Sequence, residues 1–295
     1  MKGIFHNNFF LFTLFKHYYS ITKPGIIYGN AITVIAGYIY ASHGSVDYVL
    51  LLYTLIGIAC VIASGCVFNN YIDRDIDALM ERTKKRVLIQ GGISARSALI
   101  YASLLGILGL YVLYCYTSTI TCCVAMLGLF VYVVIYSLWL KRTSVHAALI
   151  GSISGAVPIL VGYTAVAGRI DMEGVLLFCI LALWQMPHSY AIAIYRLSDY
   201  KAASLPVLPI VFGVRRTKVE MVVYACLFLI ALALLGVYGS SGYFYMIAMG
   251  VLGMFWISIC MYGLVGPSDT DTVWARKVFL FSLIILITFC VAIAV

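Results

Sequence analysis

The chain has 295 residues, of which 64% are hydrophobic and 10% are charged, and its mean hydropathy is +1.05. Soluble proteins carry about 25% charged residues, so this composition excludes a soluble globular protein and indicates an integral membrane protein. The net charge of +8 does not require a nucleic-acid partner, because membrane insertion ordinarily leaves basic residues on the inner face.

The N-terminal segment has one short apolar run at residues 9–12, followed by Lys16 and His17. It has no small-residue cleavage site and little Arg or Ser, so neither a removable signal peptide nor a mitochondrial transit peptide is expected. Nine apolar runs of membrane-spanning length, roughly 17–25 residues each, follow. They lie near residues 26–42, 48–68, 97–115, 120–140, 145–167, 174–194, 219–238, 243–264 and 277–295.

These runs predict an all-α polytopic membrane protein, a bundle of about nine transmembrane helices in a single domain, residues 1–295. The strands of a membrane barrel alternate polar and apolar residues, whereas the runs at 50–52 and 283–287 are continuously apolar. No linker rich in Pro, Gly or Ser separates a soluble domain.

Basic residues set the expected orientation. Of the 19 Lys and Arg residues, 18 precede the first run or fall in the loops after runs two, four, six and eight, and Arg169 is the exception. The positive-inside rule therefore predicts that the N-terminus and all the charged loops face the cytoplasm and that the C-terminus faces the periplasm. We expect the bacterial inner membrane, with the mitochondrial inner membrane as the alternative.

Charge gathers at the end of the second run, in residues 69–77 (Asn-Asn-Tyr-Ile-Asp-Arg-Asp-Ile-Asp). On a continued helix Asn69, Asp73 and Asp77 stand at i, i+4 and i+8 and share one face, while Asp75 points elsewhere. Oxygen ligands that include one or two carboxylates suit Mg²⁺, which also binds phosphate. The segment therefore predicts a magnesium diphosphate site at the membrane surface, with structural salt bridges to basic neighbours as the alternative.

Basic residues follow this segment closely and are expected to hold the remaining phosphate charge. The candidates for this diphosphate clamp are Arg82, Lys84, Lys85 and Arg86, with Arg196 and Lys201 next. The alternative is that the first four only anchor the protein at the inner membrane face.

A second polar group lies at the end of the sixth run. On a continued helix His188, Tyr195 and Asp199 stand at i, i+7 and i+11, which places an imidazole, a phenol and a carboxylate along one cavity wall. Ionisable groups at this depth are costly without partners, which favours a functional site. The structural alternatives are a buried, hydrogen-bonded His188 and an Asp199 paired with Arg196 or Lys201.

Aromatic rings and thiols are the remaining candidates. Five tyrosines offer ring faces that stabilise a cation, although interfacial or packing tyrosines are commoner; they are Tyr28, Tyr38, Tyr132, Tyr136 and Tyr163. The nine cysteines include no Cys-x-x-Cys pair, so we expect packing residues and no zinc or redox site.

Together these motifs resemble those of the intramembrane aromatic prenyltransferase superfamily, and most closely its protohaem IX farnesyltransferase branch. The superfamily's first motif, Asn-Asp-x-x-Asp-x-x-x-Asp, matches residues 69–77 with Asn70 at the second position. The resemblance covers nearly the whole chain, through residues 23–26, 63–66, 80–83, 184–188, 199–203 and 206–209.

The chain departs from the wider superfamily in one place. Relatives that prenylate small phenols usually carry a second Asp-rich motif, whereas this chain has Asp199 alone, with Tyr195 and Lys201 nearby. The haem branch is similar to this sequence there. The resemblance therefore favours haem over a quinone precursor as the acceptor and argues against a second complete metal cage.

The resemblance implies an Mg²⁺-dependent enzyme in which Asn69, Asp73 and Asp77 bind the ion and Asp199 holds or orients a second one. It implies that the farnesyl group of farnesyl diphosphate joins a vinyl group of haem B with addition of water. The product would be haem O, the haem of a terminal oxidase. The implied partners are both substrates, the lipid bilayer and assembly proteins of a haem-copper oxidase.

By the same resemblance His188, with Tyr195 beside it, contacts the haem as an iron ligand or as a proton acceptor. Three other functions stay open at this point: a prenyltransferase with a quinone-precursor acceptor, a secondary transporter, and a non-catalytic haem-binding or oxidase-assembly protein. Transporters place their binding groups near mid-span, whereas these carboxylates lie at the inner ends of runs two and six.

Overall fold

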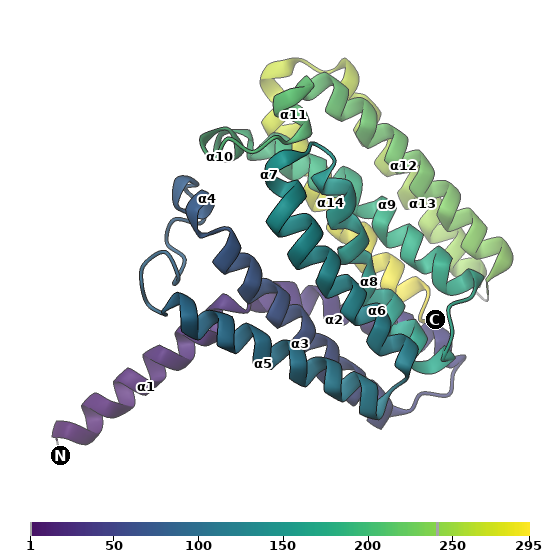
Figure 1. Cartoon of the computed structure of the whole chain (residues 1–295). Helices are drawn as coiled ribbons and strands as arrows, with labels where there is room; N and C mark the ends of the chain where they lie inside the picture. Colours follow the sequence, from purple (N-terminus) through teal and green to yellow (C-terminus); the bar gives the residue numbers. More distant parts are fainter. Residues whose placement is uncertain (1, 240–241) are drawn as a thin grey trace.

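The computed structural model describes residues 2–239 and 242–295, with side chains from residue 12 onward except that of Ser268. Every regular element in these ranges is a helix (Figure 1). In chain order the helices are α1 (Lys2–Ile21), α2 (Pro24–Ser42), α3 (Tyr48–Ile72), α4 (Arg74–Leu79), α5 (Ala95–Tyr116), α6 (Thr119–Phe130), the π-helix η1 (Val131–Leu140), α7 (Lys141–Thr143), α8 (Ala147–Ala167), α9 (Met172–Tyr195), α10 (Leu197–Ala202), α11 (Leu208–Val211), α12 (Gly213–Tyr238), α13 (Tyr243–Val265), the 3₁₀ turn η2 (Ser268–Thr270) and α14 (Asp271–Ala292).

Nine helical stretches of the described ranges are long and apolar enough to cross a membrane, which confirms the all-α polytopic fold expected from the sequence. They are α2, α3, α5, the continuous stretch α6–η1–α7, α8, α9, α12, α13 and α14. The seventh and ninth begin at Gly213 and Asp271, ahead of the apolar runs, because both helices start within the polar residues that precede those runs. Helix α1, which the sequence analysis did not predict, is not one of the nine.

Helix α8 forms the centre of the bundle and packs against α2, α6 and α9. Its contact with α2 is backbone to backbone. A Cβ added at Gly162 would lie 2.0 Å from the carbonyl oxygen of Val34, and one added at Gly37 would lie 2.2 Å from that of Ile159. Lipid gives helices no hydrophobic reason to associate, so small residues that permit close packing hold this contact together.

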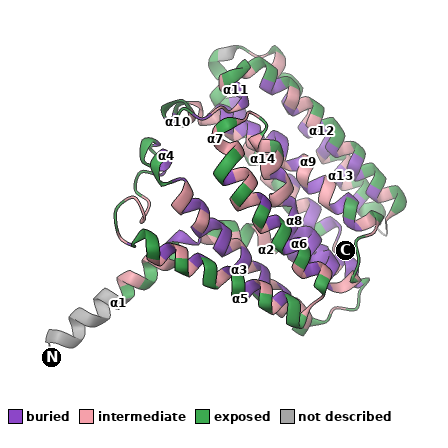
Figure 2. Cartoon of the chain, viewed as in Figure 1, coloured by how far each residue is buried: buried purple, intermediate pink, exposed green. Residues whose placement is uncertain are grey.

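The remaining spans surround α8 in two groups. Helix α3 packs on α5, and α9 packs on α12 and α14 (Figure 1). Large apolar side chains on the outer faces stay exposed, as Ile107 of α5 and Ile247 of α13 show, whereas α8 and α9 carry mainly buried and half-buried residues (Figure 2). This is the distribution expected when lipid, which is as apolar as the core, surrounds the bundle.

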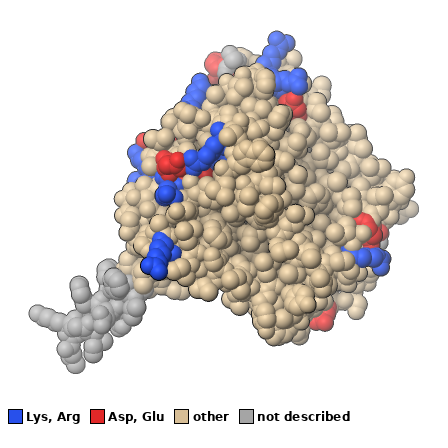
Figure 3. Space-filling model, viewed as in Figure 1, with Lys and Arg blue, Asp and Glu red and all other residues tan. Residues whose placement is uncertain are grey.

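Two polar connections meet at the charged end of the bundle. The first, residues 73–94, contains α4, and the second, residues 196–212, contains α10 and α11. Met80 of the first packs with Ala203 and Leu205 of the second. In Figure 3 the charged side chains are concentrated toward this end, with a smaller group at the opposite end. The two connections therefore cover the same end of the helices.

The α2–α8 contact predicts the effect of adding one methyl group. We expect Gly162→Ala to destabilise the protein by about 1–3 kcal/mol, because the new Cβ overpacks a backbone contact. The matched control is Gly29→Ala in α2, where a Cβ meets nothing within 4 Å. Thermal unfolding of both variants in detergent checks the difference, and equal melting temperatures would contradict it.

Candidate functional site

The predicted Asn/Asp segment lies where α3 ends. Asp73 leaves helical geometry at φ −87° and ψ 2° and separates α3 from α4, so the continued helix expected from the sequence is interrupted there. The spacing survives, because the Asp73 N–H donates to the Asn69 carbonyl (2.9 Å) and the Asp77 N–H donates to the Asp73 carbonyl (2.8 Å). Asn69 Nδ2 also donates to Asp73 Oδ2 at 2.7 Å. Asp75 points away and pairs with Arg142.

Cations from three other segments surround these groups. Lys141 Nζ contacts Asp73 Oδ2, and an Arg86 guanidinium nitrogen contacts Asp77 Oδ2. Lys23 Nζ donates to Asn69 Oδ1 at 2.6 Å. Asp73 and Asp77 are almost completely buried, and buried carboxylates require such partners. Sequence reasoning singled out Arg86 but missed Lys23 and Lys141 as site residues.

Lys23 is held in an unusual environment. Its backbone has φ 54°, in the left-handed region, directly before Pro24 opens α2. Burial, with the nearby Arg86 charge second, lowers the pKa of Lys23 to about 8. A bound anion would offset both effects and keep the ammonium protonated.

The donor set fits a magnesium ion. Asp73 Oδ1 is buried and has no hydrogen-bond partner among the described residues, which leaves that oxygen free to ligate a cation. In those same ranges no three His, Cys, Asp or Glu side chains come together as a ready metal cage. An ion held by one or two carboxylates and completed by water and phosphate oxygens is the arrangement that Mg²⁺ prefers.

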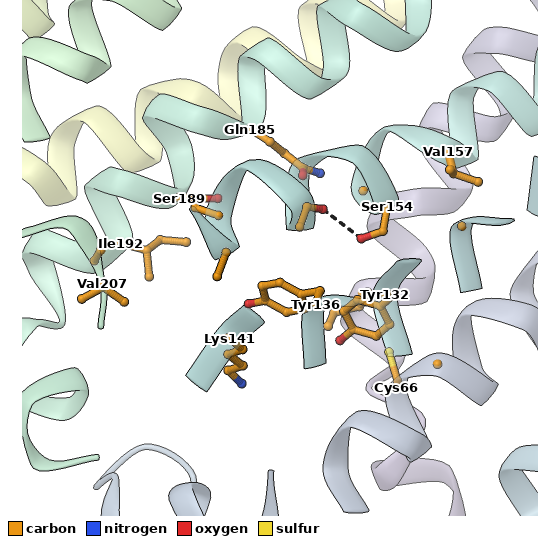
Figure 4. A pocket seen from close by; sticks show the side chains of 18 of the residues that line it. Cys66, Tyr132, Tyr136, Lys141, Ser154, Val157, Gln185, Ser189, Ile192 and Val207 are labelled. Atoms are coloured by element: carbon orange, nitrogen blue, oxygen red, sulfur yellow. Dashed lines mark hydrogen bonds between the residues drawn. The ribbon is translucent and has the colours of Figure 1, made fainter. Parts of the chain in front are cut away.

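A cavity of about 450 Å³ opens beside this cluster, within the size range of small-molecule sites, about 300–1,000 Å³. Arg82 and Lys141 line its charged end, and Val61 of α3, Leu129 of α6 and Val157 of α8 are among the apolar residues that line it deeper in the bundle. In Figure 4 the rings of Tyr136 and Tyr132 lie between Lys141 and Val157. The cavity thus joins a charged end to an apolar interior.

The π-helix η1 aligns one wall of this site. The rings of Tyr132 and Tyr136 stack with their centroids 5.9 Å apart, and both line the cavity. Ser137 Oγ accepts from Asn69 Nδ2 at 3.1 Å, and Lys141 follows directly. In an α-helix Tyr136 and Lys141, five residues apart, would differ by about 140° around the axis. A π-helix bonds residue i to i+5 and has more residues in each turn than an α-helix, so residues five apart lie closer to one face. Tyr136 and Lys141 accordingly both line the cavity.

The predicted clamp residues separate into two groups. Arg82 lines the cavity and lies 5.7 Å from the centroid of the Tyr200 ring, and Arg86 contacts Asp77. The others lie at the rim: Lys84 pairs with Glu81, Lys85 and Lys201 are exposed, and Arg196 stacks on the Tyr195 ring at 4.4 Å.

Asp199 lies on α10 across the site from the first motif. Asp199 is a buried residue, yet its carboxylate makes no hydrogen bond or ion pair within the described part of the chain, so the alternative pairing with Arg196 or Lys201 is absent there. It does not join Asp73 and Asp77 in a three-carboxylate group. Its role as a ligand of a second ion stays a prediction.

The expected shared wall of His188, Tyr195 and Asp199 is wrong, because α9 ends at Tyr195, the backbone turns at Arg196, and none of the three side chains lines the cavity. The α9 residues that line the cavity lie instead on an adjacent face of the helix. They are Gln185, Ser189, Tyr190, Ile192 and Ala193.

His188 faces α14 instead. Its Nδ1 lies 2.7 Å from Ser282 Oγ, and Ser282 Oγ donates its single proton to the Phe279 carbonyl at 2.6 Å. Ser282 must therefore accept from His188, which places the histidine proton on Nδ1. Nε2 then carries the lone pair and has no hydrogen-bond partner among the described residues. Trp184 and Phe279 pack against the ring, with centroids 4.7 and 5.0 Å away.

Of the five candidate tyrosines, only Tyr132 and Tyr136 line the cavity. Tyr38 and Tyr163 donate to Asp47 and Asp171 away from the site, and Tyr28 bonds Tyr19 at the surface.

The chain matches the model of the UbiA prenyltransferase family over residues 30–293. It is 48% identical over 271 residues to the protoheme IX farnesyltransferase of Photorhabdus laumondii, which covers 92% of each chain. A protein of the same name from Yersinia pseudotuberculosis is 48% identical over 282 residues, covering 96% of this chain and 95% of the relative.

Solved structures share the fold. A structure of digeranylgeranylglyceryl phosphate synthase has a TM-score of 0.80 at 22% identity and covers 95% of this chain and 99% of its own. A UbiA homologue from Archaeoglobus fulgidus, bound to GPP and Mg²⁺, has a TM-score of 0.67 at 14% identity and covers 94% and 99%. At such identities the likeness shows the fold alone.

The buried Lys141–Asp73 pair predicts a stability effect in the absence of metal and substrate. We expect Lys141→Met to destabilise the protein by about 3 kcal/mol, because it leaves a buried carboxylate without a counter-ion. Adding Asp73→Asn should restore much of the loss. The adjacent control, Arg142→Met, breaks a more exposed pair and should cost about 1 kcal/mol or less.

Melting temperatures in detergent with a chelator compare the four proteins. Equal destabilisation by Lys141→Met and Arg142→Met, or no recovery in the double variant, would show that the carboxylate does not need Lys141.

Proposed function

Because the chain belongs to the UbiA prenyltransferase family, we propose that it transfers the farnesyl group of farnesyl diphosphate to a vinyl group of protohaem IX, with addition of water, to give haem O. The observation that carries this proposal is the 48% identity, over more than nine-tenths of the chain, to proteins named protoheme IX farnesyltransferase. The cavity supports it, because a charged end suits a diphosphate and an apolar interior suits a farnesyl chain.

At the charged end Asn69, Asp73 and Asp77 would hold Mg²⁺, with Asp199 holding or orienting a second ion. The orphan Asp73 Oδ1 supports this assignment. The UbiA homologue from Archaeoglobus fulgidus, whose structure contains Mg²⁺ and GPP, supports the choice of metal but not of these residues. Magnesium, when bound, supplies Lewis-acid stabilisation of the departing diphosphate.

The chain's own cations complete the diphosphate site. Arg82 lines the cavity. The side chains of Lys23, Arg86 and Lys141 contact those of Asn69, Asp77 and Asp73, the residues that would hold the ion. Negative charge on the leaving group grows as the allylic C–O bond breaks, so cations placed beforehand stabilise that state more than the substrate. Lys84, Lys85, Arg196 and Lys201 would form an outer basic rim.

The apolar part of the cavity would hold the farnesyl chain. Tyr132 and Tyr136 present stacked rings there, and aromatic faces stabilise a nearby cation. Walls of Val61, Leu129 and Val157 exclude bulk water, which would otherwise capture the allylic cation before the acceptor does.

On the acceptor side we keep His188, with Tyr195 near it, as the candidate contact with haem. Its Nδ1–H is fixed by Ser282, so the lone pair on Nε2 is oriented. Histidines that bind metals commonly have their other ring nitrogen held in this way.

Nine spans make this a multi-pass membrane protein, and we propose the bacterial inner membrane, with the N-terminus and charged loops cytoplasmic and the C-terminus periplasmic. The product would then serve a terminal oxidase, with assembly proteins of a haem-copper oxidase as partners. Asp73 lies directly after the end of α3, and Asp199 lies on α10, so neither carboxylate is at mid-span. The geometry therefore gives the transporter interpretation no support.

The magnesium assignment predicts that Asp73→Ala lowers haem O formation by about a hundredfold or more, because it removes a metal ligand at the point where charge develops. The control is Asp75→Asn, in the same motif but paired outward with Arg142, which should keep activity within a few-fold. The measurement is the mass of haem extracted after incubating purified protein with haem B, farnesyl diphosphate and Mg²⁺, with and without chelator. Normal turnover by Asp73→Ala would refute the magnesium assignment.

The haem assignment predicts that His188→Ala shifts the visible absorption of bound haem and weakens haem binding, but leaves farnesyl diphosphate affinity near normal. Ser282→Ala should produce a smaller effect of the same kind, because it frees the ring without removing it. Haem titrations and binding of a non-reactive diphosphate analogue compare the variants. Equal loss of both affinities would instead indicate that His188 only supports the fold.

A further inference from the structure

Two polar side chains on the cavity wall have no hydrogen-bond partner among the described residues. Gln185 and Ser189 stand one turn apart on α9 and both line the cavity. Neither the Gln185 amide nor the Ser189 hydroxyl makes a hydrogen bond within the described part of the chain. They lie about 15 and 9 Å below the charged end of α9, where an unpaired polar group is costly and therefore indicates function.

The bundle makes room for this amide. A Cβ added at Gly155 of α8 would lie 2.0 Å from Gln185 Nε2 and 2.4 Å from its Oε1, so only glycine leaves the amide its place. Ser154, next to it, also lines the cavity, but its hydroxyl is satisfied by the Gly151 carbonyl at 2.9 Å. Gln185 and Ser189 lie across the cavity from Tyr136 and Lys141 (Figure 4).

The reactants decide what these groups bind. A farnesyl chain and the vinyl edge of a haem are both apolar and offer no hydrogen bond, so neither satisfies an amide and a hydroxyl. The diphosphate is assigned to the cations at the charged end, and the haem propionates, as carboxylates, require cations or bulk water. The reactant left for a neutral amide and hydroxyl is water, which forms about three hydrogen bonds when buried. We propose that Gln185 and Ser189 hold the single water molecule that adds to the haem vinyl group, an inference that rests on the proposed function.

The allylic C–O bond of farnesyl diphosphate breaks and its electron pair leaves with diphosphate. The terminal vinyl carbon forms a bond to C1 of the farnesyl group, which leaves positive charge on the vinyl carbon next to the haem ring. The water oxygen held by Gln185 and Ser189 bonds to that carbon, and its proton passes to the released diphosphate. Fixing one water beside the vinyl carbon also keeps it from C1, where it would give farnesol.

Product analysis tests this role separately from catalysis as a whole. Without a held water, the vinyl-derived cation loses a proton and yields a haem product lighter by one water. We expect Gln185→Leu to lower the ratio of hydroxylated to dehydrated product by about tenfold, the effect of one hydrogen bond. Ser189→Ala should shift the ratio in the same direction, and the control Ser154→Ala should leave it at the wild-type value.

The assay uses the full-length protein in detergent with haem B, farnesyl diphosphate and Mg²⁺, and mass spectrometry of the extracted haem. Should Gln185→Leu not fold, the smaller change Ser189→Ala decides. Wild-type ratios in the folded variants would overturn the proposal. Complete loss of haem product, with folded protein and normal substrate affinity, would overturn it too, since it places these residues before the water step. If the wild-type protein itself forms no farnesylated haem, the proposed function fails instead.

Discussion

Two carboxylates, Asp73 and Asp77, are buried where a membrane span ends, and the site depends on how their charge is balanced. Lys141 and Arg86 contact them, and Lys23 contacts the neighbouring Asn69. These cations come from segments before α2, after η1 and after α4. The pairing therefore ties four parts of the chain together at the charged end. It also assembles, before any ligand binds, the positive charge that a diphosphate requires.

The rest of the bundle separates this charged end from an apolar interior. Close backbone packing at Gly162 joins α2 to α8, and the cavity runs between these helices, α3, η1 and α9. The packed polar connections, with Met80 against Leu205, cover the end at which the carboxylates lie. The ionic and the apolar half of one substrate can therefore bind in different parts of the same cavity. The charged end suits the ionic half, and the apolar interior suits the other.

The sequence predicts what depends on local pattern. Apolar length alone is enough for the nine spans, and the i, i+4 spacing is enough to bring Asn69 to Asp73. It does not reveal partners that tertiary structure supplies: Lys23 lies 46 residues from Asn69, and Lys141 lies 68 from Asp73. It also does not reveal which face of α9 meets the cavity. That helix is apolar on most sides, so the sequence alone does not show whether His188 or Gln185, three residues apart, faces the cavity. Packing places Gln185 at the cavity and His188 against Ser282 of α14.

The π-helix η1 gives one span an unusual sensitivity to length. A bilayer tolerates a span that is one residue longer or shorter, because tilt absorbs the difference. Deleting one residue between 131 and 136 would favour a return to α-helical winding, in which Tyr136 and Lys141, five residues apart, differ by about 140° around the axis. Lys141 would then no longer share the face that Tyr136 presents to the cavity, although the helix would still cross the membrane. The register of this span is thus set by a counter-ion, and natural or engineered insertions and deletions should be tolerated in α12 or α13 long before they are tolerated here.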